Sequence, residues 1–128
     1  MKHTREELIN YRIERAKESL EEAKLLAQKN HWNTVANRLY YSAFYAINAL
    51  FVKHEIQGAT HSGVKSHFHN EFIKTGLLNK DFGKLYNNLF NKRQEGDYQD
   101  FQLFDKETIE PLIEKVEFFI QAIEIIIY

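Results

Sequence analysis

An arginine, an aspartate and a tyrosine lie close together in one short stretch of the chain, residues 88–98. Leu85 and Leu89 are four residues apart, which indicates the buried face of a helix. Arg93 continues that spacing at a position where an apolar residue is expected. A guanidinium group carries planar, paired donors that match the oxygens of a phosphate. Arg93 is therefore the first candidate for a phosphate-recognising residue.

Asp97 and Tyr98 follow Arg93 by four and five residues. Asp97 shares the face of Arg93 if the helix continues beyond Gly96, although glycine often ends a helix. Two interpretations remain open. In the first, Arg93 binds a phosphate, with Arg38 and Tyr98 beside it. In the second, Arg93 and Asp97 form a partly buried ion pair that fixes the end of the helix.

Apolar residues at spacings of three and four predict a chain made of helices. The predicted helices span residues 4–29, 32–54, 63–74, 80–95 and 106–127. Their predicted caps are Thr4, Thr60 or Ser62, Asn79 or Asp81, and Asp105. The helix at 32–54 has two apolar sides, which places it at the centre of the fold. We expect an all-α, up-and-down helical bundle of about five helices, forming a single domain over residues 1–128.

The last predicted helix, 106–127, also carries apolar residues on more than one side. This pattern predicts that the bundle interior covers one side and that a second subunit covers the other, as in a homodimer. In the loop before this helix, Phe101 and Phe104 are expected to pack against the core.

The composition limits which classes of function are expected. The chain has 128 residues, of which 44% are hydrophobic, and a net charge of -1. This charge provides no global positive field, so DNA binding is not expected and any RNA contact needs a local basic patch. The sequence has no cysteine, its charged N-terminus does not resemble a signal peptide, and its longest apolar run, residues 125–128, is too short to span a bilayer. We expect a soluble cytoplasmic protein without a membrane segment.

Histidines and tyrosines offer further candidates. His61, His67 and His69 resemble a metal cluster, but residues two apart point to different faces of a helix, so no metal site is expected. His61 is expected to take part in capping. The tyrosines can stack on bases or donate to phosphates, or they can be core residues with satisfied hydroxyl groups. They are Tyr40, Tyr41, Tyr45 and Tyr98. Similarly, Arg38 can face a polar cavity or extend to solvent.

Four blocks in order carry a resemblance to a known family. They are RLYYSAFYAINAL at 38–50, THSGV at 60–64, FIKTGLL at 72–78 and LFNKRQEGDY at 89–98. Together they resemble the HEPN domain family of prokaryotes, over nearly the whole chain. The resemblance implies a compact helical bundle that usually dimerises and often functions beside a minimal nucleotidyltransferase, as toxin and antitoxin. Many members of the family are metal-independent ribonucleases.

The chain departs from the family at the catalytic signature, an arginine followed after four to six residues by a histidine at the dimer interface. Arg93 matches the arginine, but Tyr98 stands where the histidine is expected, and no histidine follows it. Tyr45 also stands where the family often has a histidine. Tyrosine titrates at about pH 10 and aspartate at about pH 4, so either is a weak general base near neutrality.

Three hypotheses follow, none of which requires a cofactor. The first is a HEPN-like dimer that binds a nucleotide or RNA phosphate through Arg93, Arg38 and Tyr98, beside a minimal nucleotidyltransferase in a toxin–antitoxin-type system. The second is a metal-independent ribonuclease with Arg93, Asp97 and Tyr98 as catalytic residues. The third is a purely structural dimerisation module.

Overall fold

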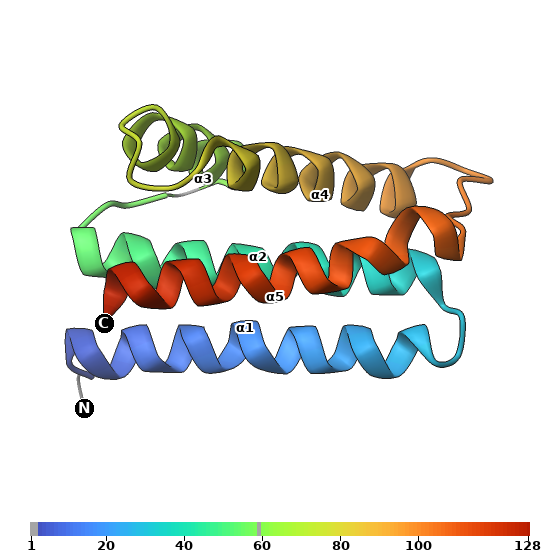
Figure 1. The fold of residues 1–128 in the computed structure, drawn as a ribbon, viewed down its shortest axis with the longest axis horizontal. Helices are drawn as coiled ribbons and strands as arrows, with labels where there is room; N and C mark the ends of the chain where they lie inside the picture. The colour runs from blue at the N-terminus through green and yellow to red at the C-terminus, as the bar shows by residue number, and fades with distance from the viewer. Residues whose placement is uncertain (1–2, 59) are drawn as a thin grey trace.

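The computed structural model describes residues 3–58 and 60–128; Met1, Lys2 and Ala59 lie outside the described part. Its elements are α1 (Arg5–Ala27), α2 (Trp32–His54), α3 (His61–Phe68), the π-helical segment η1 (His69–Ile73), α4 (Lys80–Tyr98) and α5 (Lys106–Ile127). The four long helices, α1, α2, α4 and α5, alternate in direction, so that α1 starts and α5 ends at the same end of the molecule (Figure 1). No strand occurs among the described residues. The predicted all-α, up-and-down bundle is confirmed.

Several predicted boundaries are also confirmed. The helices expected at 32–54 and 106–127 coincide with α2 and α5. The caps Thr4, Asn79 and Asp105 each accept a hydrogen bond from a backbone N–H in the first turn of their helix. Local capping chemistry therefore starts α1, α4 and α5 where the sequence indicates. No helix in the described part of the chain has the length and apolar character needed to cross a membrane.

The third helical segment differs from its prediction in its start and in the winding of its second half. Thr60 is its cap and accepts a hydrogen bond from the backbone N–H of Gly63 at 2.9 Å, so α3 begins at His61 instead of residue 63. His61 is thus the first helical residue and not the cap. The second half of the segment is the π-helix η1, which ends at Ile73. The apolar spacing predicted a helix here but could not predict its change of winding.

Helix α4 continues through Gly96 and ends at Tyr98. A Cβ at Gly96 would lie 3.1 Å from Cε2 of Phe104, so the glycine lets the following loop pack closely on the helix. Phe104 is accordingly half-buried, as predicted. Phe101 is 99% exposed and has a φ of 63°, so its prediction as a packing residue was wrong. The longer helix brings Arg93 and Asp97 onto one face.

Helix α2 lies at the centre and packs against α1, α4 and α5. Small residues allow close approach: the Ser42 hydroxyl donates to the Ala16 carbonyl at 2.7 Å in the contact with α1. Ile109, Ile120 and Ile127, on the second apolar side of α5, are buried within the single chain. A second subunit is therefore not needed to cover them, because α5 packs against α1, α2 and α4. Phe118 and Ile125 of α5 remain exposed.

Candidate functional site

Arg93 lies in a group of tyrosines near the end of α4. Its side chain is only 11% exposed. The guanidinium carbon lies 5.2 Å from the ring centre of Tyr40, 5.3 Å from that of Tyr41 and 5.9 Å from that of Tyr98. Aromatic faces attract a cation at such distances, so the rings hold the positive charge in place. The two rings from α2 and the one from α4 explain why a guanidinium is tolerated where the apolar spacing expects a core residue.

The contact between Arg93 and Asp97 is a weak one. Arg93 Nε lies 3.5 Å from Asp97 Oδ2, and the same carboxylate oxygen accepts a hydrogen bond from Asn37 Nδ2 at 3.1 Å. Arg93 Nε is buried and has no hydrogen-bond partner in the described part of the chain. A structural ion pair usually satisfies its donors through short, paired contacts. Here the Nε donor of Arg93 is held in place without a hydrogen-bond partner among the described residues.

Arg38 reaches the same tyrosines from α2. Its guanidinium carbon lies 5.3 Å from the ring centre of Tyr41, the ring that Arg93 also contacts. Asn37 Oδ1 accepts two hydrogen bonds from Arg38, at 3.1 and 2.8 Å, and Glu22 lies 3.5 Å away. Arg38 is thus held at the edge of the site, with its side chain 29% exposed. The structure brings together all four residues that the sequence singled out, Arg38, Arg93, Asp97 and Tyr98.

His61 belongs to this site, although its position in the sequence predicted only a part in capping. Its Nδ1 lies 2.6 Å from the Tyr40 hydroxyl oxygen. Its ring centre lies 5.8 Å from that of Tyr40 and 6.1 Å from that of Tyr41, the two rings that also contact Arg93. Burial and, to a smaller extent, the charge of Arg93 lower the pKa of His61, which favours its neutral form.

The hydrogen bonds of the tyrosines determine which nitrogen of His61 carries the proton. Burial raises the pKa of both Tyr40 and Tyr86, so both hydroxyl groups keep their protons. Tyr86 donates to Tyr40 at 3.4 Å, and Tyr40 then donates to Nδ1 of His61. The opposite order would leave the buried Tyr86 proton without an acceptor, which is costly. In the neutral ring, Nε2 therefore carries the proton and is a donor.

The other two histidines have different surroundings. Nε2 of His69 lies 2.8 Å from Oδ1 of Asn87, while the ring centre of His67 lies 6.2 Å from that of Phe51. Within residues 3–58 and 60–128, no group of three or more histidine, aspartate or glutamate side chains is arranged to hold a metal ion.

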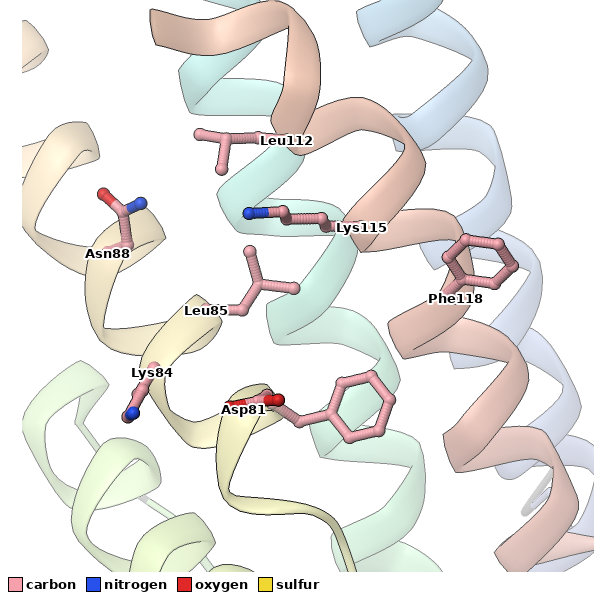
Figure 2. Close-up of a pocket in the computed structure, with 8 residues that line it drawn as sticks. Asp81, Lys84, Leu85, Asn88, Leu112, Lys115 and Phe118 are labelled. Carbon is pink, nitrogen blue, oxygen red and sulfur yellow. The ribbon is translucent and has the colours of Figure 1, made fainter.

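A separate groove lies between α4 and α5 (Figure 2). Its volume is about 490 Å³, and Leu85 and Leu112 point into it from the two helices. Lys84, Lys115 and Asp81 also line it, and the Lys115 side chain extends from α5 toward α4. The residues that line it include neither Arg93 nor the tyrosines and the aspartate around it, so this groove is distinct from the tyrosine-lined site. Its mixed charges and apolar floor do not resemble a phosphate site.

The fold and the site together define a helical-bundle protein with a cationic, tyrosine-lined candidate site. A family model described as the HEPN domain matches residues 9–126. The chain therefore belongs to the HEPN domain family, and the resemblance found in the sequence is confirmed.

Relatives extend the similarity over most of the chain. A Thermotoga maritima protein named "UPF0332 protein" is 41% identical over 94% of this chain and 91% of its own length. Two relatives come from Methanocaldococcus jannaschii. The one named "Putative toxin MJ0142" is 37% identical over 84% of this chain and 74% of its own length. The other, "Putative toxin MJ0605", is 29% identical over 96% and 90%.

Proposed function

We propose that this chain is the toxin-type member of a toxin–antitoxin pair and that it binds the phosphate of a nucleotide or of RNA at Arg93. The observation that carries the proposal is the Arg93 guanidinium held within the tyrosine group with its Nε unsatisfied. Its Nε is buried without a hydrogen-bond partner among the described residues, and three rings hold its charge in place. A phosphate would supply the acceptors that the surrounding protein does not.

His61 and the tyrosine rings suit the same ligand. The Nε2–H of His61 is a neutral donor close to the cation, since both residues contact Tyr40 and Tyr41. Phosphate recognition commonly combines a charged donor with neutral ones. Tyr98 is 72% exposed and provides a ring face on which a base can stack. Cation, donor and ring together favour a nucleotide over an inorganic anion.

The interpretation of Arg93 and Asp97 as a purely structural ion pair has less support. Asp97 is one-third exposed and is also hydrogen-bonded to Asn37, so its charge does not depend on Arg93 alone. In the proposed function, Asp97 competes with the phosphate for Arg93, and Tyr98 and Arg38 stand beside the bound group.

Substitution of Asp97 separates these two roles. Asp97→Asn keeps the shape and removes the competing negative charge, so binding of a labelled nucleotide should become tighter, while Arg93→Ala should abolish it. Isothermal titration calorimetry with uridine monophosphate measures both effects. Binding that survives Arg93→Ala unchanged would overturn the proposal. If Arg93 and Asp97 form a structural ion pair, Asp97→Asn should instead lower the melting temperature and leave the affinity for uridine monophosphate unchanged.

Metal-independent ribonuclease activity is the second candidate function. It is favoured by the carboxylate 3.5 Å from Arg93, which provides a weak base beside the residue that would hold the scissile phosphate. His61 is less suited to act as a base, because its Nε2 carries a proton in the neutral ring. Cleavage of RNA by the purified protein in the presence of a chelator, lost in Asp97→Ala, would favour this candidate over simple binding.

The names of the two archaeal relatives support the toxin assignment, and the family resemblance supports a homodimer paired with a minimal nucleotidyltransferase. The exposed Phe118 and Ile125 of α5 offer apolar surface for assembly. Sedimentation at micromolar concentration should report about twice the chain mass of 15.3 kDa. A monomer at every concentration would contradict the dimer but would leave the Arg93 site to be judged by its own test.

A further inference from the structure

The charges of the chain are unevenly distributed, and the segment from α3 through most of α4 is basic. Residues 61–94 contain six lysines and arginines but only two acidic residues, Glu71 and Asp81, on a chain whose net charge is -1. Asp81 lines the groove between α4 and α5 (Figure 2), and Glu71 is exposed on η1. This segment therefore has more cations than carboxylates of its own, which favours an anionic ligand.

A polar hollow of about 450 Å³ lies in this basic segment, where α3 and η1 pack beside α4. The only residue that lines it from α4 is Phe90, which is buried. The other residues that line it are polar or basic, and none of them is acidic: Ser62, Lys65, Ser66, His69, Asn70 and Lys74. We call this site the α3–η1 hollow.

The π-helical winding of η1 brings the last of these residues onto the same face as the others. The backbone N–H of Lys74 donates to the carbonyl of His69 at 2.8 Å, a bond that spans five residues. In an α-helix, residues five apart are separated by about 140° around the axis, whereas the wider π turn closes between them. Lys74 therefore lies on the side of His69 and Asn70. Short π-helical segments of this kind are frequent at functional sites.

The two lysines of the hollow lack a carboxylate partner. Among the residues that the structure describes, neither Lys65 nor Lys74 belongs to an ion pair. Lys65 is half-buried, and its ammonium nitrogen lies 4.7 Å from the ring centre of Phe90, which holds the charge in place. His69 Nε2 lies 2.8 Å from Asn87 Oδ1 and so ties η1 to α4. The hollow thus combines positioned cations with neutral polar groups.

We propose that the α3–η1 hollow binds a small phosphorylated molecule that also carries hydroxyl groups, such as a phosphorylated sugar or polyol. Lys65 and Lys74 hold the phosphate oxygens. Ser62, Ser66 and Asn70 both donate and accept hydrogen bonds, and they contact the hydroxyl groups of the ligand. The volume lies within the range of small-molecule sites, about 300–1,000 Å³. This site is separate from Arg93 and does not rest on the function proposed there.

Macromolecules are poorer occupants of the hollow. A nucleotide or an RNA strand needs an open ring face on which a base can stack. The rings here are Phe90, which is buried beneath Lys65, and His69, which is half-buried against Asn87. Protein interfaces have apolar centres that are depleted in lysine, but no large, exposed apolar side chain lines the hollow. A compact phosphorylated molecule therefore matches it best.

The experiment measures the binding of inositol monophosphate by isothermal titration calorimetry. Lys65→Gln and Lys74→Gln should each weaken binding at least about tenfold, because each removes a charged donor to the phosphate. Lys84→Gln, the same change at an exposed position of α4 in the other groove (Figure 2), is the matched control and should alter the affinity by less than about twofold. Equal losses in the three variants would overturn the site in favour of a general charge effect.

Arg93→Ala separates this proposal from the one at the tyrosine-lined site. The variant should bind inositol monophosphate within about twofold of the wild type while it loses uridine monophosphate. Loss of inositol monophosphate in Arg93→Ala, with none in Lys65→Gln, would show that both ligands bind at Arg93 and would overturn the hollow. Retention of uridine monophosphate in Arg93→Ala would overturn the proposed function and leave the hollow unaffected.

Ser66→Ala tests whether the neutral groups recognise the body of the ligand. It should weaken inositol monophosphate several-fold and leave inorganic pyrophosphate, which has no polyol body, nearly unchanged. Melting curves check that each variant is folded. Binding of pyrophosphate without inositol monophosphate, or binding of neither at millimolar concentration, would contradict the proposal. A loss in Lys65→Gln without a loss in Lys74→Gln would show that the π-helical winding does not build the site.

Discussion

The hydroxyl oxygen of Tyr40 lies 2.6 Å from Nδ1 of His61 and thereby ties the centre of α2 to the first residue of α3. The contact joins residues 21 positions apart and continues to the buried Tyr86 on α4. Three helices therefore determine where the His61 ring lies and which of its nitrogens carries the proton. Because Arg93 contacts the Tyr40 ring, the same tyrosine also fixes the histidine relative to the cation.

The first prediction concerns Tyr40→Phe. This change leaves the hydroxyl group of Tyr86 and Nδ1 of His61 without their partner, so the free energy of unfolding should fall by about 1–3 kcal/mol. Chemical denaturation measures the loss. The control is Tyr45→Phe, which removes a half-exposed hydroxyl group and should cost less than about 1 kcal/mol. Equal costs in the two variants would contradict a special role for the buried hydrogen-bond chain.

The second prediction concerns pH. The pKa of His61 is lowered in the folded protein, chiefly by burial, so the unfolded chain binds the proton more readily. Folding stability should therefore rise with pH between the folded pKa and the unfolded value of about 6.5. On acidification the contribution is lost from about pH 6.5 downwards, and it reaches its limit below the folded pKa.

Comparison with His61→Gln separates the contribution of His61 to the pH dependence from that of the carboxylates, which also titrate on acidification. The variant should lose less stability than the wild type when the pH is lowered from about 7.5 to about 5.5, as measured by urea denaturation at each pH. A direct titration of the His61 ring by NMR should give a midpoint below about 6.5. Parallel stability curves for the two proteins would show that His61 does not contribute to the pH dependence.

The third prediction concerns Gly83, which is buried in α4 opposite η1. Glycine to alanine in a helix usually stabilises by about 1 kcal/mol. Here a Cβ would lie 3.0 Å from Cε1 of His69 and 3.2 Å from Cγ2 of Ile73. We expect Gly83→Ala to lower stability by about 1–3 kcal/mol, because the crowding outweighs the helix propensity and strains the contact between His69 and Asn87. A higher melting temperature in the variant would show that η1 adjusts without cost.

Much of the fold was predictable because it depends on local rules. The spacing of apolar residues gave the four long helices, and side chains such as Thr4 and Asp105 marked their starts. The i, i+4 spacing also placed Arg93 and Asp97 on one face on the condition that the helix continues beyond Gly96, which it does. These features depend on residues within one or two helical turns of each other, where periodicity carries the information.

The features that were missed depend on contacts between distant segments. His61 reaches Tyr40 only because α3 packs beside α2, and no spacing within one helix indicates that contact. Helix α4 continues to Tyr98, past a glycine whose close packing against Phe104 in the following loop is a contact between separate segments. Phe101 turns outward on a backbone with positive φ, a conformation unusual for its residue type. Asn37, which bridges Arg38 and Asp97, had no sequence signal of its own.

The fourth prediction concerns Tyr98→Phe. The side chain is 72% exposed, and its ring lies 5.9 Å from the Arg93 guanidinium carbon. Loss of the hydroxyl group alone should change stability by less than about 0.5 kcal/mol. Nucleotide affinity should change only modestly, because the ring remains available for stacking. Loss of a measurable RNA cleavage activity in this variant, with binding retained, would favour the ribonuclease candidate.

The last prediction concerns the free energy of unfolding of Arg93 variants, which distinguishes a binding site from a structural ion pair. Removing one partner of a fully buried ion pair costs about 3–5 kcal/mol. Asp97 is one-third exposed and keeps its hydrogen bond from Asn37, so Arg93→Ala should cost only about 1–2 kcal/mol. Denaturation with urea measures this cost.

Arg93→Lys sharpens the same comparison, since lysine keeps the charge but loses the planar fork. The variant should unfold nearly as the wild type, because the carboxylate still faces a cation and is partly solvated. Its affinity for uridine monophosphate should nevertheless fall about tenfold or more, since paired contacts to phosphate oxygens are lost. A different outcome would contradict phosphate binding at Arg93: a cost of about 3–5 kcal/mol for Arg93→Ala, the value for a fully buried pair, together with unchanged nucleotide binding in Arg93→Lys. Arg93 would then stabilise the helix end and would not be the phosphate-binding residue.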